Sequence, residues 1–278
     1  ATMPLEHSFD LRALKFGAAP DDSFLRARFQ QGSTLLKSSG NTTVDVLRSG
    51  KKQTTLQFST DYDRNYNRVR CFTLLPGDRA AVGAAFGLYL FDTGSGKQLR
   101  KFVGHTGTVW AVSPSPDGRY LLTASNDMTV RVWDPDEEKP LLSLFFAGEE
   151  WVAWTPEGYY ASSPGGETLM GWHLDSGPDA MGSFARASQF RESLYKPEAI
   201  KMLLRTGSMT RALEATGNRQ GETRVAEVLP PTVVIVRPDT GDVTTDTEEL
   251  TVMAVAQQVG MHPITSMQLL LDGRPLGG

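Results

Sequence analysis

The stretch GHTGTVWAVSPSPDGRYLLTASNDMTVRVWD, residues 104–134, consists of short apolar segments separated by turn-forming residues. The segment 109–113 runs into Pro-Asp-Gly, the segment 120–124 runs into Asn-Asp, and the segment 129–133 ends in Trp-Asp. Short apolar runs bounded by such residues are typical of strands joined by tight turns. The stretch therefore predicts consecutive antiparallel β-strands.

The same order of strands and turns occurs in neighbouring parts of the chain. Three units align, with first turns PGDR, PDGR and PEGY: residues 69–102, 109–144 and 151–174, the last without its final strand. In each unit the third strand ends in an aromatic residue, namely Phe91, Trp133 or Trp172. A weaker fourth unit of short strands precedes them at residues 24–59. The repeat of roughly forty residues is typical of β-propeller blades.

The pattern changes after the third unit. Residues 188–208 space their apolar side chains as a helix does, with Pro197 suited to a first turn, and Ser208 can cap a second short helix. From Val228 three strand-like segments follow, which resemble the opening of an immunoglobulin-like (Ig-like) sandwich of about seven strands.

We therefore expect a mainly β fold. Residues 1–180 are expected to form about four propeller blades, and residues 181–227 a short helical connector. Residues 228–278 are expected to begin a partial Ig-like β-sandwich. Four blades would make an unusually small propeller, because propellers have four to eight blades. We therefore expect the propeller to be incomplete and the chain to be a segment of a longer protein.

Composition excludes several classes of function. The net charge is −4, and no dense Lys/Arg block occurs, which argues against nucleic acid as a partner. No apolar run approaches the ~20 residues that a membrane helix needs, so no membrane partner is expected. The single cysteine, Cys71, cannot form an intramolecular disulfide, which suits a reducing compartment and hence the cytoplasm.

The opening stretch resembles a WD40 repeat, in its Gly-His at 104–105, its Pro-Asp-Gly at 116–118 and its SNDMTVRVWD at 125–134. In WD40 blades these residue types form a hydrogen-bond chain that braces the blade. The resemblance implies that this role falls to four residues here: Asp127, His105, Thr123 and Trp133. The flanking units match the repeat more loosely, since the first has Phe-Asp in place of Trp-Asp and the third has Trp-His.

A hydroxyl, a histidine and an aspartate can also form a nucleophilic triad, so an enzyme with its active site in this segment is the alternative. Such a triad needs an exposed hydroxyl beside an oxyanion hole, and the chain has no G-x-S-x-G elbow. The one thiol, Cys71, falls in an alternating strand, where we expect it to be a buried core residue. Phosphate-binding glycine motifs are absent and the histidines are scattered, so neither a cofactor nor a metal site is expected.

A second resemblance extends over residues 105–278. The segments 149–179, 188–204 and 228–238 resemble the join in bacterial multidomain proteins where WD40 repeats are followed by a helical connector and an Ig-like domain. A caspase-like (peptidase C14) domain commonly follows in those proteins. The resemblance implies a non-catalytic, regulatory scaffold whose partner is another protein or a fused protease domain.

Candidate contact surfaces are fewer. The polar segment 61–67 holds Tyr62 and Tyr66, and Trp151 is spaced to lie on the opposite strand face from Trp154. The segment 61–67 is expected to be an exposed, solvated loop, with a contact surface at Tyr62 and Tyr66 as the alternative. Of Trp151 and Trp154 one is able to face a partner, with Trp151 the candidate, and the other tryptophans are expected to pack inside the blades.

Overall fold

A computed structural model describes residues 8–18, 27–58, 67–174, 183–218, 231–238, 250–258, 263–271 and 274–275. The fold is mainly β, as the sequence predicts. The chain divides into two compact units. The first comprises Ala1–Met170 with Lys196–Arg219, and the second comprises Gly171–Tyr195 with Gln220–Gly278.

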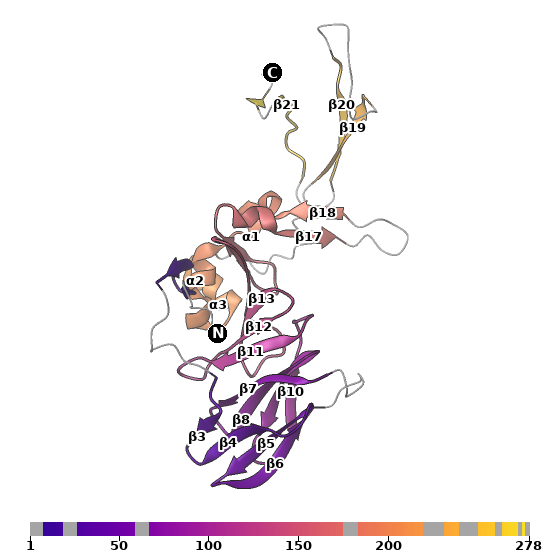
Figure 1. Cartoon of the computed structure of the whole chain (residues 1–278). Helices are drawn as coiled ribbons and strands as arrows, with labels where there is room; N and C mark the ends of the chain where they lie inside the picture. Colours follow the sequence, from indigo (N-terminus) through magenta and orange to yellow (C-terminus); the bar gives the residue numbers. More distant parts are fainter. Residues whose placement is uncertain are drawn as a thin grey trace. The chain divides into compact units, whose positions relative to one another are not determined.

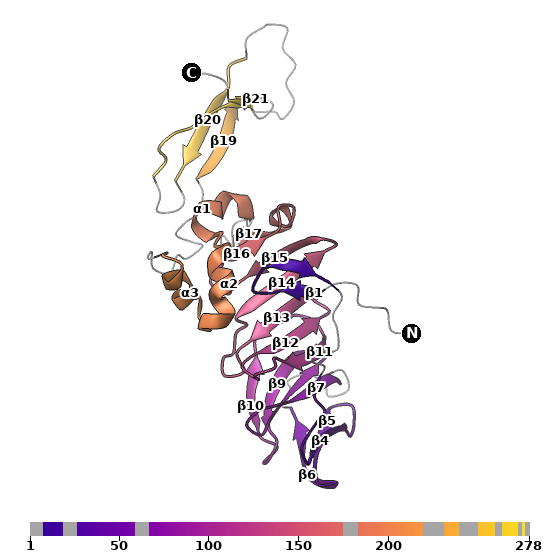
Figure 2. The same ribbon diagram turned by 90° about the vertical axis from the view of Figure 1, so that its left-hand side faces the viewer.

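Most strands of the first unit form three antiparallel sheets that follow one another along the chain (Figures 1 and 2). The first sheet contains β3 (Gln30–Gln31), β4 (Thr34–Ser38), β5 (Thr43–Arg48) and β6 (Lys51–Gln57). The second contains β7 (Val69–Leu75), β8 (Arg79–Ala84), β9 (Gly87–Asp92) and β10 (Gln98–Phe102). The third has six strands: β11 (Val109–Pro114), β12 (Leu121–Ser125), β13 (Thr129–Trp133), β14 (Leu142–Ala147), β15 (Glu150–Trp154) and β16 (Tyr160–Ser162).

The three sheets pack on each other through the alternating side chains of their strands. In β8, Ala80 and Val82 contribute to the cluster shared with the first sheet, whereas Ala81 contributes to the cluster shared with the third. In β9 Tyr89 faces the first sheet and Leu90 faces the third. Since successive side chains of a strand point to opposite faces, the second sheet is apolar on both faces and is buried between its neighbours.

Two helices and a hairpin complete the first unit. Helix α2 (Pro197–Thr206) packs against β16, and α3 (Met209–Ala215) packs against α2. Pro197 occupies the first turn, and because the residue before a proline disfavours helical geometry, the preceding helix ends before it. The Tyr120 hydroxyl donates to the carbonyl oxygen of Leu204 at 2.8 Å and so ties the third sheet to α2. The hairpin pairs β1 (Ser8–Asp10) with β2 (Lys15–Gly17).

The second unit contains smaller elements. Strand β17 (Gly171–Leu174) pairs with β18 (Ser183–Arg186), followed by the 3-10 turn η2 (Ala187–Phe190) and α1 (Arg191–Leu194). Strand β19 (Thr232–Arg237) pairs with β20 (Met253–Gln257), and β21 (Leu270–Leu271) pairs with β22 (Arg274–Pro275). The described strands beyond Pro231 form two separate two-stranded sheets, and the Ig-like sandwich stays an expectation. No helix of the described part is long and apolar enough to cross a bilayer.

The unit predicted at residues 151–174 differs from its prediction. Its first two strands, β15 and β16, extend the third sheet through pairing with β14, whereas β17 belongs to the other compact unit. The short 3-10 helix η1 (Gly166–Leu169) stands between them. The pairing of β15 with β14 follows from the tight turn between them. Gly148 in this turn has a φ of +62°, which lets the chain reverse directly into a hairpin. The described sheets do not close into a ring. The division into blades, connector and Ig-like domain at residues 180 and 227 stays a prediction.

The turn glycine of the repeat makes a close contact between sheets, which a substitution can test. Gly118 has a φ of +72°, and a Cβ on it would lie 2.3 Å from Cγ of Pro76 in the matching turn of the second sheet. Gly50 has a similar φ of +76°, with nothing within 4 Å of a Cβ. We expect Gly50→Ala to lower the free energy of unfolding by about 1 kcal/mol through backbone strain. We expect Gly118→Ala to lower it by a further ~1–3 kcal/mol through the clash.

Urea denaturation of the two variants measures this difference directly. Equal losses in Gly118→Ala and Gly50→Ala would mean that the turns of neighbouring sheets do not press on each other.

Candidate functional site

Four side chains of the third sheet form a continuous hydrogen-bond chain. The indole Nε1–H of Trp133 donates to Thr123 Oγ1 at 2.8 Å, and Thr123 Oγ1 lies 2.7 Å from Nε2 of His105. The other ring nitrogen, Nδ1, lies 2.8 Å from Oδ2 of Asp127. The structure thus brings together the four residues named by the WD40 resemblance.

The protons of this chain can be assigned from its donors. The Trp133 indole can only donate, so Thr123 accepts from it and directs its own hydrogen to Nε2 of His105. Nε2 is then unprotonated, and the imidazole proton lies on Nδ1, where it is donated to the Asp127 carboxylate. A second proton on His105 would leave the Thr123 hydroxyl without its acceptor.

Burial sets the charges of the two titratable members. It lowers the pKa of the His105 imidazole below its usual value of 6.5, against the opposing attraction of Asp127. It would raise the pKa of Asp127, but hydrogen bonds donated by Thr129 and His105 outweigh it and hold that pKa well below its usual range. At neutral pH the pair is therefore a neutral imidazole beside a carboxylate.

The tight turn after β12 places Asp127 for this role. Its carboxylate accepts from the backbone N–H of Thr106 at 3.1 Å and of Thr129 at 3.0 Å, and from the Thr129 hydroxyl at 2.6 Å. Gly107 permits the close approach, because a Cβ there would lie 2.8 Å from the backbone nitrogen of Asp127. The carboxylate thus joins the segment that carries His105 to the turn between β12 and β13.

This arrangement is unsuited to nucleophilic catalysis. Thr123 is 2% exposed, and both Trp133 and His105 already occupy its hydroxyl, so that oxygen is not presented as an open nucleophile. The Cys71 thiol is half-buried, and burial raises its pKa to about 12, so it stays a thiol at neutral pH. Among the described residues, no three His, Cys, Asp or Glu side chains gather in a group that could hold a metal ion.

The predicted contact residues need a correction. Tyr62 and Tyr66 lie outside the described residues. Trp151 is 8% exposed, because the ring of Phe9 in the β1–β2 hairpin packs edge-on against it with 5.2 Å between ring centroids. It is therefore a buried residue of this unit rather than a surface one.

The exposed tryptophan is Trp110, for which the strand pattern predicts a place inside the blades. It is 52% exposed, and the register shift between Val109 and Ala111 makes it the extra residue of a β-bulge in β11. The neighbouring strand β7 has the same irregularity at Arg70, and the Arg70 guanidinium carbon lies 4.9 Å from the centroid of the Trp110 ring. Bulges redirect side chains. Successive side chains of a strand point to opposite faces, so a residue directly after the buried Val109 is expected to point outward. This alternation is the sequence signal for the position of Trp110.

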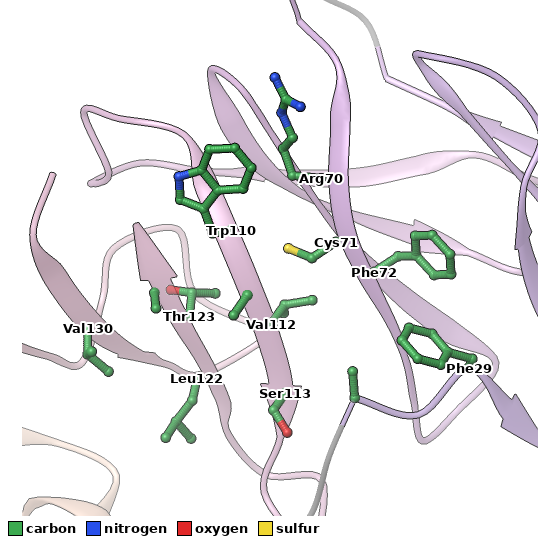
Figure 3. Close-up of a pocket in the computed structure, with 13 residues that line it drawn as sticks. Phe29, Arg70, Cys71, Phe72, Trp110, Val112, Ser113, Leu122, Thr123 and Val130 are labelled. Carbon is green, nitrogen blue, oxygen red and sulfur yellow. The ribbon is translucent and has the colours of Figure 1, made fainter. Parts of the chain in front are cut away.

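Trp110 and Arg70 border a pocket of about 620 Å³, hereafter the Trp110 groove. Figure 3 shows Trp110 and Arg70 at one end, the rings of Phe29 and Phe72 at the other, and Cys71 between them. The remaining lining comes from the chain before β3 and from β11, β12 and β13: Ala27, Ala111, Val112, Ser113, Leu122, Thr123, Ala124 and Val130.

The groove combines an apolar floor with one cation. The Phe29 and Phe72 rings meet edge-on at 5.3 Å, and Phe29 is 50% exposed. Within the described part of the chain Arg70 forms no salt bridge, so its guanidinium keeps its donors for a ligand while it stacks on the indole. The Trp110 indole nitrogen donates weakly to the Asn126 side chain at 3.4 Å.

Comparison with known proteins identifies the class of the repeat. A family model described as "WD domain, G-beta repeat" matches residues 96–134, the segment that holds His105, Thr123, Asp127 and Trp133. The chain therefore contains a WD40 repeat, which confirms that part of the resemblance.

Among particular relatives, nuclear distribution protein PAC1 of Arthroderma benhamiae is 40% identical over 63 residues, which cover 23% of this chain and 14% of that protein. WD repeat-containing protein 3 of Mus musculus is 41% identical over 66 residues, 23% of this chain and 7% of that protein. The chain thus spans a small part of the relatives that it matches. The solved WD40 beta propeller domain of Doa1 aligns with a TM-score of 0.37 and 16% identity, over 46% of this chain and 45% of that chain.

The hydrogen-bond chain predicts a large cost for losing the Thr123 hydroxyl. Thr123→Val leaves the Trp133 indole N–H and His105 Nε2 buried without partners, and each unsatisfied group costs about 1–3 kcal/mol. We expect the free energy of unfolding to fall by about 2–5 kcal/mol in Thr123→Val. Thr123→Ser keeps the hydroxyl and loses one methyl group, so its loss should be about 1 kcal/mol. Similar values for both variants in chemical denaturation would contradict this role.

The lowered pKa of His105 predicts acid sensitivity. In the unfolded chain the imidazole takes up a proton near its usual pKa of 6.5, whereas the folded chain resists it until a lower pH. The unfolded state therefore binds more protons below that value, and stability should decline as the pH falls below 6.5. Asp127, whose folded pKa is lowered, adds to the loss once the pH falls below its usual pKa of 3.8.

Denaturation between about pH 7.5 and 5 measures the decline, since His105 titrates in this window. His105→Gln should flatten it, because this variant has no imidazole at that position to take up a proton. An unchanged slope in His105→Gln would overturn the assignment.

Proposed function

We propose that this chain is a protein-interaction scaffold whose Trp110 groove binds a segment of a partner protein. The observation that carries the proposal is the exposed Trp110 with Arg70 stacked on it at the border of an apolar pocket. Tryptophan and arginine are the residue types that most often dominate the energy of protein interfaces.

The groove sets the chemistry of the partner segment. Its aromatic and aliphatic lining accepts a large apolar side chain, and the Arg70 guanidinium offers paired donors to a neighbouring carboxylate. Two rigid rings, Phe29 and Phe72, lose little conformational entropy on binding. We propose that the segment carries a large apolar residue next to an acidic one.

Selection from a random peptide library displayed on phage tests this function. Peptides that pair a large apolar residue with Asp or Glu should be enriched on the immobilised protein. Trp110→Ala should weaken their binding by more than about tenfold, as at interface hot spots, and Arg70→Gln should remove the preference for the acidic residue. Leu99→Ala is the control, because Leu99 is 47% exposed on β10 and outside the groove. Equal enrichment on Trp110→Ala and on the wild type would overturn the proposal.

A finer proposal concerns the protein in which this scaffold stands. We propose a larger bacterial, cytoplasmic protein in which residues 181–227 connect WD40 blades to an Ig-like domain, followed by a caspase-like protease domain. The proposal rests on the resemblance of residues 149–179, 188–204 and 228–238 alone, since the matched relatives named above are eukaryotic WD proteins. The coding sequence after Gly278 tests it. A strand ending in His-Gly, with a later strand ending in Cys, supports the protease, and the absence of both contradicts it.

A further inference from the structure

A second pocket, of about 720 Å³, lies where three segments of the first unit meet. They are the turn of the β1–β2 hairpin, the turn between β11 and β12, and the C-terminal end of α2. We name it the arginine pocket, because Arg12, Arg119 and Arg205 line it, one from each segment. It borders the Trp110 groove at Ser113 and Leu122, which line both.

A fourth arginine stands close to this pocket. A Cβ on Gly207 would lie 3.9 Å from Nη2 of Arg211 and 4.0 Å from Nη2 of Arg119, so two guanidinium groups gather around one point. Arg119 also lies over the ring of Tyr120, with its guanidinium carbon 5.4 Å from the ring centroid. Like charges at this separation repel unless an anion lies between them.

The nearby carboxylates offset only part of the charge of the arginines: Asp117 lines the pocket and attracts Arg119, and Asp10 attracts Arg12. Asp117 accepts from the Ser115 hydroxyl at 2.6 Å, Asp134 accepts from the backbone of Asp136 at 2.9 Å, and Asp10 accepts from the backbone of its own turn. Within the described residues, none of the four arginines forms a salt bridge. The pocket therefore carries an excess of positive charge in a chain whose net charge is −4.

The walls between the arginines are apolar. They are formed by Leu122 and Val132 of the third sheet, by Leu204 of α2 and by Leu11 of the hairpin turn. A bare inorganic anion would use the guanidinium groups and leave these walls in water. A peptide that alternates carboxylates with apolar side chains uses both.

We propose that the arginine pocket binds an acidic peptide segment of a partner protein. Its carboxylates pair with Arg119 and Arg205, and an apolar side chain lies against Leu122 and Leu204. The site is separate from the proposed function of the Trp110 groove, although the two pockets adjoin at Ser113 and Leu122.

Fluorescence anisotropy with a labelled, end-blocked peptide of glutamates around a central leucine pair tests the proposal. We expect binding that weakens as salt is added, because exposed charge pairs are screened. Arg205→Gln and Arg119→Gln should each weaken it by roughly tenfold, the equivalent of one charge-assisted hydrogen bond. Lys51→Gln removes one positive charge from an exposed part of β6 and is the matched control. Trp110→Ala should bind the peptide as the wild type does.

Two outcomes would overturn the proposal. One is equal affinity for a peptide whose glutamates are replaced by glutamine, or for the Arg205→Gln variant. The other is loss of binding in Trp110→Ala alone, which would place the peptide in the Trp110 groove. The acidic turn at residues 135–138 could occupy the arginine pocket of a second copy and compete with the peptide. Sedimentation of the protein without peptide shows whether the chain associates with itself in this way. Thermal unfolding of each variant separates lost binding from lost folding.

Discussion

The structure depends on one constraint: the middle sheet is apolar on both faces, so each face must be covered. Ala80 and Val82 of β8 pack toward the first sheet while Ala81 packs toward the third, and β9 divides its side chains in the same way. A sheet of this kind is stable only between two others. The third sheet has the same property on its far face, where helix α2 and the β1–β2 hairpin provide part of the cover. The arginine pocket lies along this face, where the cover is incomplete, and it adjoins the Trp110 groove at Ser113 and Leu122.

The hydrogen-bond chain is the polar exception inside this apolar stacking. Trp133 belongs to the cluster between the second and third sheets, and its indole N–H must find an acceptor there because an unsatisfied buried donor is costly. Thr123 and His105 supply acceptors in sequence, and Asp127 ends the chain at a turn whose backbone N–H groups stabilise its charge. A neutral imidazole is the only form of His105 that satisfies every member. The same chain that could have been taken for a catalytic triad therefore makes the strands and turns of this sheet interdependent.

The surface residues were harder to predict than the interior ones. A bulge at Trp110 and another at Arg70 bring the two side chains together from strands about forty residues apart, and no local pattern announces that they stack. The burial of Trp151 could not be predicted either, since Phe9 reaches it from the far end of the unit. Each of these outcomes depends on which strand lies beside which, and that is a property of the packed sheets.

The sequence by itself determined the strands, the turns and the hydrogen-bond chain, because these depend on residues close together in a repeating pattern. Pro-Gly and Pro-Asp-Gly turns and the alternation along the strands are local signals, and the resemblance of residues 104–134 to a WD40 repeat implied the hydrogen-bond chain of His105, Thr123, Asp127 and Trp133. Only the tertiary structure decided how many strands the third sheet contains and where the pockets lie. In the structure β15 pairs with β14, and α2 packs against β16. The sequence of residues 151–174 is equally compatible with a separate unit of strands. Which of the two forms depends on the apolar face of the third sheet that the rest of the unit leaves uncovered.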